Sequence, residues 1–306
     1  MVIMRCLLSR SAPVWRWFCL LAFLGAGAGA AAEQGVLDRV KAGGHLVIAH
    51  RESSIPFSYF DAERHPVGYA MDLCLRIAEA VRKKIGLKDL PIDYLAVGPV
   101  DRMTVIEQGK ADLECGSTTN NADRRQHVAF TVPHFIVGAR MLVRADNPAS
   151  SLDDLNGKTV VSTHGTTPLK VIDQLNHQHL LNLKIVEAPD HQQALDKVLK
   201  GEADAFVMDD VLLYGLIANQ PRPADWKVVG KFLTTEPLAI MLPKGDAAFK
   251  QVVDEEMKRL IYSREIYAIY ERWFMRPIPP HGTSLNLPVS YLLKDFWKYP
   301  TDQVPF

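Results

Sequence analysis

Arginine and hydroxyl side chains follow apolar stretches of this 306-residue chain at positions where they could bind an anion. Arg51 comes shortly after the apolar run 46–49. The stretch 117–120 (Ser-Thr-Thr-Asn) follows another apolar run, and Arg124 lies four residues beyond it. A guanidinium presents a fixed fork of donors to a carboxylate, and hydroxyl groups add neutral hydrogen bonds. The stretch 117–124 could therefore hold the α-carboxylate of an amino acid. Arg51 is either a second carboxylate ligand or a solvated loop residue.

Two further polar groups complete the candidate site. Thr166 and Thr167 precede Pro168, which suits the first turn of a helix, and Asp209 follows the apolar run 205–208. In open α/β sheets, ligands bind just beyond the carboxyl ends of strands, where helix N-termini favour anions. The threonines thus offer hydrogen bonds to a ligand, and the aspartate could meet an ammonium group. Helix capping is the alternative role for both groups.

The elements that must position these residues alternate between strands and helices. Apolar residues recur at helical spacing over 72–85, between strand-like runs at 46–49 and 91–95. This alternation predicts an α/β protein with largely parallel sheets. Towards the C-terminus we expect one long helix that runs through Tyr270, followed by a proline-rich tail from Arg276.

One pattern occurs twice along the chain. A helical stretch at 102–108 is followed by Gly-Lys-Ala-Asp and a strand, and a helical stretch at 194–200 is followed by Gly-Glu-Ala-Asp and a strand. The glycine of each copy suits a helix C-cap. The repetition predicts two lobes of similar design that share a polar site at their strand ends, with chance similarity as the alternative.

The first 32 residues differ from the rest of the chain. Three arginines precede a short apolar run at 17–24, and small residues follow it up to Ala32. This is typical of a secretory signal peptide, which we expect to be cleaved near Ala30–Ala32, and the apolar run is short for a membrane anchor. Removing residues 1–32 leaves 32 basic and 35 acidic residues, a net charge of −3, which argues against a nucleic-acid partner.

The cysteines divide into two pairs. Cys6 and Cys19 lie within the predicted signal peptide, whereas Cys74 and Cys115 lie in apolar surroundings. We therefore expect Cys74 and Cys115 to be buried free thiols. A disulfide between them, favoured by an oxidising compartment, is the alternative.

Four motifs together resemble one protein family. They are His-Arg-Glu-Ser-Ser at 50–54, Gly-Ser-Thr-Thr-Asn at 116–120, His-Gly-Thr-Thr at 164–167 and Met-Asp-Asp at 208–210. In this order and spacing they resemble the periplasmic glutamate/aspartate-binding proteins of ABC importers, within solute-binding protein family 3. The resemblance covers about residues 35–280. It implies a two-lobed clamshell of the type II periplasmic-binding-protein class, in which each lobe is a mainly parallel sheet flanked by helices and two strands form the hinge.

The resemblance also implies a domain organisation. After a signal peptide at 1–32, a discontinuous first lobe would comprise residues 33–139 and 235–306, and a second lobe would comprise residues 140–234. The hinge crossings would lie near 137–141 and 232–237. A ligand bound between the lobes would stabilise the closed state, which the membrane subunits of an ABC transporter would recognise. We expect a periplasmic monomer.

The family's binding residues carry over to eight positions of this chain. The arginine that matches Arg124 binds the α-carboxylate, and the acid that matches Asp209 binds the α-ammonium group. The side-chain carboxylate would face the matches of Arg51, Arg102 and His191, although His191 could instead only cap a helix. The full implied set is Arg51, Arg102, Ser117, Thr119, Arg124, Thr167, His191 and Asp209.

Charge agrees with an acidic ligand in this assignment. Arg51, Arg102 and Arg124 opposed by Asp209 would leave a positive site, and a neutral ligand would leave two arginines without partners, at a cost of several kcal/mol. Pro99 departs from the family, which has a small hydroxyl residue three positions before the arginine at 102. The choice between glutamate, aspartate and another dicarboxylic amino acid therefore stays open.

Two other functions are alternatives. An enzyme on the same fold, similar to the cyclohexadienyl or arogenate dehydratases, would need a general acid or base, for which Glu52, His191 and Asp209 are candidates. A sensor ectodomain would need a second membrane segment and a signalling domain. We see no hydrolase or metal motif, so we predict a binding protein and not an enzyme, with no metal and no cofactor.

Overall fold

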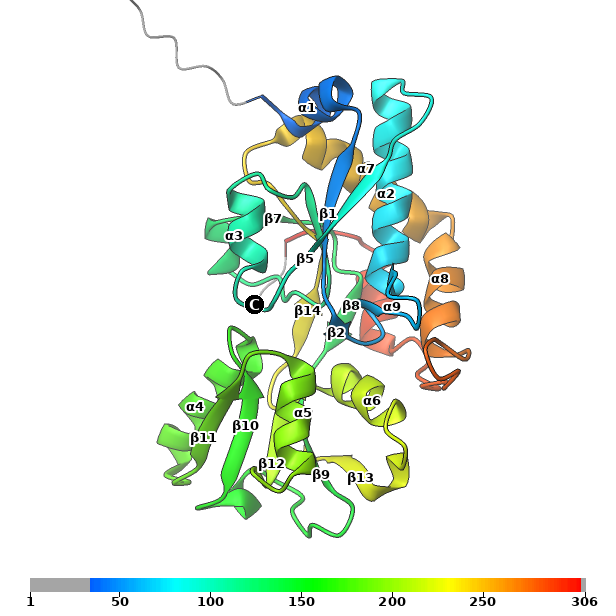
Figure 1. Ribbon diagram of the computed structural model, residues 1–306. Coiled ribbons are helices and arrows are strands. Elements are labelled where there is room, and N and C mark those ends of the chain that lie inside the picture. Colours follow the sequence, from blue (N-terminus) through cyan, green and yellow to red (C-terminus); the bar gives the residue numbers. More distant parts are fainter. Residues whose placement is uncertain (1–33, 304–306) are drawn as a thin grey trace, which may run out of the picture. The chain divides into compact units, whose positions relative to one another are not determined.

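Two five-stranded sheets dominate the computed structural model, which describes residues 34–303 (Figure 1). The predicted signal peptide lies outside the described residues. From Gly35 onward, the described chain belongs to one compact unit. No helix within residues 34–303 is long and apolar enough to cross a membrane.

The first sheet is built from the N-terminal part of the chain and one late strand. Its strands in spatial order are β5 (Ile92–Ala96), β1 (Leu46–His50), β6 (Leu113–Cys115), β15 (Met241–Leu242) and β7 (Ala129–Phe130). β1 pairs in parallel with β5 and β6, and β15 pairs antiparallel with β6 and β7. Within the described chain, β15 is thus the strand of this sheet that runs against the others.

The second sheet repeats this arrangement. Its strands in spatial order are β11 (Lys184–Ala188), β10 (Thr159–Thr163), β12 (Ala205–Asp209), β9 (Ala139–Arg144) and β13 (Trp226–Val229). β10 pairs in parallel with β11 and β12, and β9 pairs antiparallel with β12 and β13. The predicted α/β class and the two lobes of similar, mainly parallel design are therefore confirmed.

The chain passes between the two sheets twice. A short antiparallel pair, β8 (Phe135–Val137) with β14 (Glu236–Leu238), belongs to neither sheet and lies between them in Figure 1. Gly138 joins β8 to β9, and residues 230–235 join β13 to β14. A smaller sheet is formed by β2 (Ser53–Ser54), β3 (Ser58–Phe60) and β4 (Pro66–Val67). The lobe boundaries at 139/140 and 234/235 and the function of these crossings as a hinge stay predictions.

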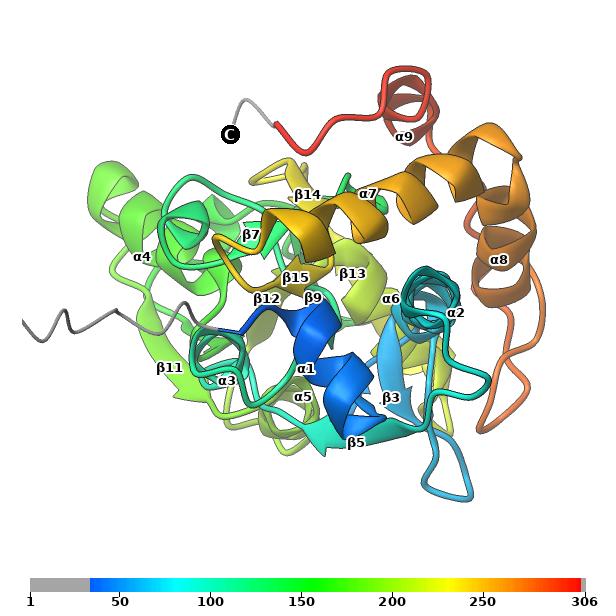
Figure 2. The same ribbon diagram turned by 90° about the horizontal axis from the view of Figure 1, so that it is seen from above.

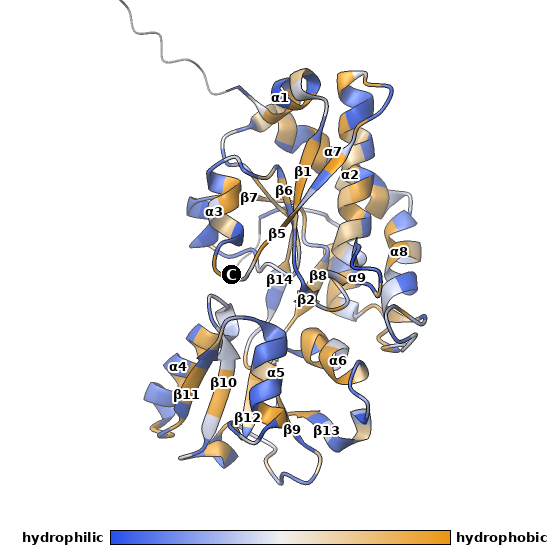
Figure 3. Cartoon of the chain, in the orientation of Figure 1, coloured by the Kyte–Doolittle hydropathy of each residue, from blue (hydrophilic) through white to orange (hydrophobic). Residues whose placement is uncertain are grey.

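Helices pack on both sheets and carry hydrophilic residues on their outer sides, while the central strands are mainly hydrophobic (Figure 3). The described α-helices are α1 (Val36–Gly43), α2 (Tyr69–Ile85), α3 (Arg102–Glu107), α4 (Thr167–His179), α5 (His191–Leu199), α6 (Asp210–Ala218), α7 (Ala247–Tyr262), α8 (Glu265–Phe274) and α9 (Tyr291–Phe296). In the first lobe, α2 packs against β1 and β6 and against α7 and α8. In the second, α4 and α5 pack against β10 and β12. Short 3-10 turns lie at Arg124–Gln126, Asp153–Leu155 and Pro223–Asp225.

Helix α2 begins one turn earlier than the predicted 72–85. Gly68 precedes it with a φ of 139°, and a Cβ at this position would clash with the carbonyl group of Phe57. Glycine is required where φ is positive and the backbone approaches this closely. The predicted stop is confirmed, because Gly86 is the left-handed C-cap of the helix.

The prediction of one long helix through Tyr270 is wrong. α7 ends at Tyr262 and α8 starts at Glu265, because Arg264 adopts a left-handed conformation with a φ of 65°. Apolar residues continue on both sides of this break, so their periodicity gave no sign of it.

The proline-rich tail also contains an unpredicted element. Figure 2 shows its helix α9 on the same side of the chain as α7 and α8. Trp297 follows this helix, and its ring packs edge-on against Tyr267 of α8 at 5.1 Å. The Trp297 Nε1 atom donates to the carbonyl oxygen of Pro133, at 3.4 Å. The tail thus returns to the first lobe through aromatic packing, which helical or strand periodicity does not reveal.

A disulfide joins Cys74 and Cys115, so the expectation of two free thiols is wrong. Cys74 lies on the buried face of α2 and Cys115 is the last residue of β6, with their Cα atoms 6.3 Å apart. The two residues meet because α2 packs directly on β6. The sequence indicated apolar surroundings for each cysteine but not that the two side chains face each other.

His134 is buried in an aromatic cluster. Its burial should make the stability of the fold sensitive to acid. Neither of its ring nitrogens has a hydrogen-bond partner among the described residues, and its ring lies 5.9 Å from Phe57 and 5.6 Å from Tyr69. Burial lowers its pKa to about 3. An unfolded histidine titrates near pH 6.5, so between pH 6.5 and 3 the unfolded chain binds a proton that the folded one does not. Stability is therefore lost as the pH falls, by about 2 kcal/mol for this residue between pH 7 and 5.

Urea unfolding at pH 7 and pH 5 measures this contribution. We expect the His134→Phe variant to lose about 2 kcal/mol less than the wild type over this interval. The exposed His177 provides a matched control, since His177→Gln should lose as much as the wild type. Equal losses in the wild type and in His134→Phe would contradict the prediction. Packing strain from the larger ring cancels, because the two pH values are compared within one protein.

Candidate functional site

The eight predicted site residues lie where strands end or helices begin, and both lobes contribute to the set. Arg51 directly follows β1, Ser117 and Thr119 follow β6, and Arg124 opens a 3-10 turn. Arg102, Thr167 and His191 are the first residues of α3, α4 and α5, and Asp209 is the last residue of β12. The sheet edges thus place the predicted residues between the two lobes.

Six of the eight residues line one small cavity. They are Arg102, Ser117, Thr119, Thr167, His191 and Asp209. Met208 and Leu212 supply part of the apolar wall. The free volume is about 10 Å³, roughly the room that one water molecule needs. The lobes therefore close directly on each other at this point.

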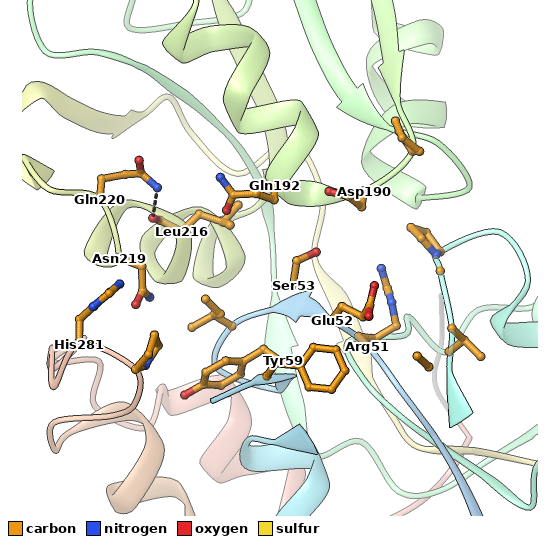
Figure 4. A pocket seen from close by; sticks show the side chains of 18 residues that line it. Arg51, Glu52, Ser53, Tyr59, Asp190, Gln192, Leu216, Asn219, Gln220 and His281 are labelled. Carbon is orange, nitrogen blue, oxygen red and sulfur yellow. Dashed lines mark hydrogen bonds between the residues drawn. The ribbon is translucent and has the colours of Figure 1, made fainter. Parts of the chain in front are cut away.

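Arg51 lies in a neighbouring, larger cleft of about 630 Å³ (Figure 4). Arg51 and Glu52 lie on one side of this cleft, and Asp190 and Gln192 lie across it. Pro99, the residue that departs from the family pattern, is buried in its wall. The site consequently has two parts, a tight interlobe cavity and a wider cleft beside Arg51.

Arg102 and Arg124 connect the two lobes through the carbonyl group of Gly165. Arg102 Nη1 donates to Thr118 Oγ1 at 2.8 Å, and Arg124 Nη1 donates to the Thr119 carbonyl oxygen at 2.9 Å. A second nitrogen of each arginine donates to the carbonyl oxygen of Gly165 in the other lobe, at 3.5 and 3.4 Å. Both guanidinium groups are thereby fixed at the interlobe cavity.

All three arginines are buried. Arg51 is 2% exposed, Arg102 3% and Arg124 9%. Burial, and after it the positive charge of Arg102, lowers the pKa of Arg51 and of Arg124 to about 9, which leaves both charged at neutral pH. Nη1 of Arg51 has no hydrogen-bond partner among the described residues. Leaving a buried guanidinium nitrogen without a partner costs free energy, so a ligand acceptor that bonded to this atom would remove that cost.

Two carboxylates were missed by the sequence reasoning. Glu114 in β6 is fully buried with no hydrogen-bond partner for either oxygen among residues 34–303, and Glu236 in β14 is 6% exposed. Gly116 makes room for Glu114, since a Cβ there would clash with the Glu114 carboxylate and with Arg51 Cγ. A lone acid inside an apolar strand was the signal that could have identified Glu114.

These carboxylates correct the predicted charge balance. Glu114, Glu236 and Asp101 act on Arg102 by charge in addition to Asp209, so the three arginines face more than the one acid considered from the sequence. The predicted charge balance, which counted Asp209 alone against the three arginines, was therefore incomplete. The predicted preference for an acidic ligand therefore depends on where the individual arginines lie and not on net charge.

The Asp209 carboxyl group has a strongly perturbed environment. It is 3% exposed, its Oδ1 atom has no hydrogen-bond partner in the described chain, and it makes no side-chain cap bond to α6. Burial first, and then the charge of Glu236, raises its pKa well above the usual value. The capping alternative for Asp209 is thus not supported, and an acceptor is left directed at the cavity.

His191 and Thr167 are also not engaged in capping; Thr167 lies inside α4, whose N-cap residue Thr166 makes no side-chain cap bond. Asp190 is the N-cap of α5, where its carboxylate accepts a bond from the Gln193 amide, so the alternative of a capping His191 is wrong. His191 Nδ1 lies 2.8 Å from Thr163 Oγ1, while Nε2 has no partner within the described residues. Burial, and then Arg51 and Arg102, lowers the His191 pKa well below its usual value, so the ring is neutral.

The hydroxyl groups of Thr119 and Thr167 meet across the lobes. Their Oγ1 atoms are 3.2 Å apart. Thr119 donates to Glu236 Oε2 at 2.7 Å, and Thr167 donates to the same oxygen.

Within residues 34–303, no group of three or more histidine, cysteine, aspartate or glutamate residues is arranged to hold a metal ion.

Two similar α/β lobes, joined by two crossing segments and with buried charges between them, define a type II solute-binding fold. A solved structure of a mutant of ArgBP from T. maritima has this fold, with a TM-score of 0.68 and 24% identity over 78% of this chain and 98% of that one. Residues 46–276 match the family model for bacterial extracellular solute-binding proteins, family 3. The chain belongs to this family.

Curated relatives match over most of their length. An L-glutamate/L-aspartate-binding protein of Pseudomonas aeruginosa is 42% identical over 88% of this chain and 89% of its own length. A glutamate/aspartate import solute-binding protein of Escherichia coli is 37% identical over 87% of this chain and 88% of its own length.

Proposed function

We propose that this protein is a periplasmic solute-binding protein that captures L-glutamate or L-aspartate between its lobes and delivers it to the membrane subunits of an ABC importer. Membership of the family and the names of the two curated relatives support this class of function. They also support a binding protein over a dehydratase-like enzyme. We further propose that the protein acts as an exported monomer after cleavage near Ala30–Ala32.

One observation carries the choice of an acidic ligand. Arg51 is 2% exposed beside the site, and its Nη1 atom lacks a partner among the described residues. A side-chain carboxylate would supply a charge-assisted acceptor to this nitrogen, whereas a neutral side chain would leave it unpaired. The charge of Arg51 also acts on His191, whose neutral ring could add one N–H donor from Nε2.

The remaining roles follow from the positions of the charged groups. Arg124 would bind the α-carboxylate together with Ser117, and Asp209 would accept from the α-ammonium group. The charge of Arg102 acts on both Arg51 and Arg124, so Arg102 would assist Arg51 at the side-chain carboxylate. The roles of all eight predicted residues remain proposals.

Ligand entry requires the lobes to separate. A cavity of about 10 Å³ cannot hold an amino acid, and the lobes touch directly through Thr119, Thr167 and the Gly165 carbonyl group. The ligand would enter an open form and then replace these direct contacts with bonds of its own to both lobes. Closure would be a ligand-driven population shift across the two crossing segments.

Calorimetry on the protein that begins at residue 33 tests this function. We expect heat from L-glutamate and L-aspartate and affinities at least 100-fold weaker, about 3 kcal/mol, for L-glutamine and L-arginine. The reason is that only an acidic side chain brings an acceptor to Arg51. Tight binding of glutamine without heat from glutamate would overturn the acidic-ligand proposal. Incubation of the same protein with arogenate or prephenate should give no product, and turnover would favour the enzyme instead.

A further inference from the structure

Glu236 connects the hydroxyl groups of the two lobes. It lies in the crossing strand β14, and its Oε2 atom accepts hydrogen bonds from Thr119, which follows β6 in the first lobe, and from Thr167, which begins α4 in the second. Its Oε1 atom accepts from Thr234 Oγ1 at 2.8 Å. The side chain is 6% exposed. A single buried carboxylate therefore receives one hydroxyl from each lobe.

The number of hydroxyl protons limits how many hydrogen bonds the two threonines can donate. Each threonine hydroxyl has one proton to donate and two lone pairs that accept. The protons of Thr119 and Thr167 are both directed at Glu236, so neither hydroxyl can donate to a ligand carboxylate while these bonds persist. Their oxygens remain available as acceptors, and an ammonium group brings three donors.

The surrounding groups also divide the site into a part with hydrogen-bond acceptors and a part with donors. Acceptors gather around Glu236, where the two hydroxyl oxygens lie 3.2 Å apart and Asp209 lines the same cavity. Donors gather around the three arginines. The charge of Glu236 also contributes to the raised pKa of Asp209. A positively charged group of the ligand fits this acceptor cluster, and a carboxylate does not.

We propose that Glu236 is a positioning residue of the ligand site. It takes the hydroxyl protons of Thr119 and Thr167, so that both oxygens face the ligand's ammonium group as acceptors, and the same two bonds tie the lobes together in the closed form. This inference rests on the proposed function only in that the ligand is an amino acid.

The opposite arrangement makes a different prediction. If the two hydroxyls donated to the ligand's α-carboxylate, Glu236 would compete with the ligand for their protons. Removing its charge would then strengthen binding. If Glu236 served only the stability of the fold, its replacement would act on binding independently of the two hydroxyls.

A double-mutant cycle on L-glutamate affinity separates these cases. Glu236→Gln keeps the shape of the side chain, but the amide nitrogen donates to one hydroxyl and turns its proton towards the ammonium group. We expect at least tenfold weaker binding. In a Thr119→Val, Thr167→Val background, the same change should alter affinity less than twofold, because the hydroxyls through which Glu236 acts are gone. When Thr119 is replaced by serine instead of valine, a hydroxyl is kept, and the sensitivity of glutamate affinity to Glu236→Gln should return.

Each other result overturns the proposal. Stronger glutamate binding by Glu236→Gln would show competition, and equal losses in both backgrounds would show an independent structural role. Unchanged affinity would show no role at all. Thr234→Val is the matched control, because it removes a hydroxyl bond to the other carboxylate oxygen and should change affinity less than threefold. Failure of the wild type to bind any amino acid would instead refute the proposed function, which keeps the two failures distinct.

Discussion

Replacing Arg124 with alanine is expected to abolish measurable binding of L-glutamate, L-aspartate and every other amino acid. The Arg124 guanidinium is 9% exposed and already fixed by the Thr119 and Gly165 carbonyl groups, so it is positioned before a ligand arrives. Truncating one member of a buried charge pair costs about 4 kcal/mol, which is about a thousandfold in affinity. Since every amino acid carries an α-carboxylate, the loss should not depend on the side chain of the ligand.

Calorimetry on Arg124→Ala tests this prediction, with Arg51→Ala and Arg125→Ala as controls. Arg51→Ala should weaken the acidic ligands selectively and leave any weak glutamine binding unchanged. Arg125→Ala changes the adjacent arginine, which donates to the Asn120 side chain at 2.8 Å and does not line the cavity, and it should retain most of the affinity. Circular dichroism and thermal unfolding would establish that each variant is folded. Normal glutamate binding by a folded Arg124→Ala protein would refute the assigned role.

Loss of the Cys74–Cys115 disulfide is expected to reduce the free energy of unfolding by about 4 kcal/mol. The bond links residues 41 positions apart, and closing a loop of this length restricts the unfolded chain by about that amount in the chain-entropy model. It also fastens the helix α2 to the end of β6, two residues before Ser117. Because neither cysteine lines the cavity, glutamate affinity should change less than threefold.

Urea unfolding of protein that begins at residue 33, with and without reductant, measures this effect. Such protein contains only Cys74 and Cys115, so a free-thiol titration after unfolding should find none without reductant. The Cys74→Ala, Cys115→Ala variant is the matched control, because its stability should not respond to reductant. Two free thiols in the oxidised wild type, or a wild type as stable with reductant as without it, would contradict the disulfide.

Most of the local organisation was predictable from the sequence. The helix that Gly86 ends, the alternation of strands and helices and the two Gly-x-Ala-Asp copies all correspond to elements of the structure. These signals are local, because helix and strand periodicities and glycine caps depend on residues that are neighbours in the chain. The motifs also identified eight residues, six of which line one cavity.

The break at Arg264 marks the limit of such signals. An apolar stripe predicts that a helix packs against the core, but it continues when one residue takes a left-handed conformation and a second helix starts. The aromatic packing of Trp297 is likewise invisible locally, because its partner Tyr267 belongs to another helix.

The sequence by itself thus determined which residues offer charges and hydroxyls and at which strand and helix ends they lie. The tertiary structure decided how these groups pair. Glu236 is 117 residues from Thr119 and 69 from Thr167, yet one carboxylate oxygen receives both hydroxyls. The disulfide and the burial of Glu114 beside Arg51 arise in the same way. Such pairings depend on how distant segments cross and pack, and no local spacing encodes them.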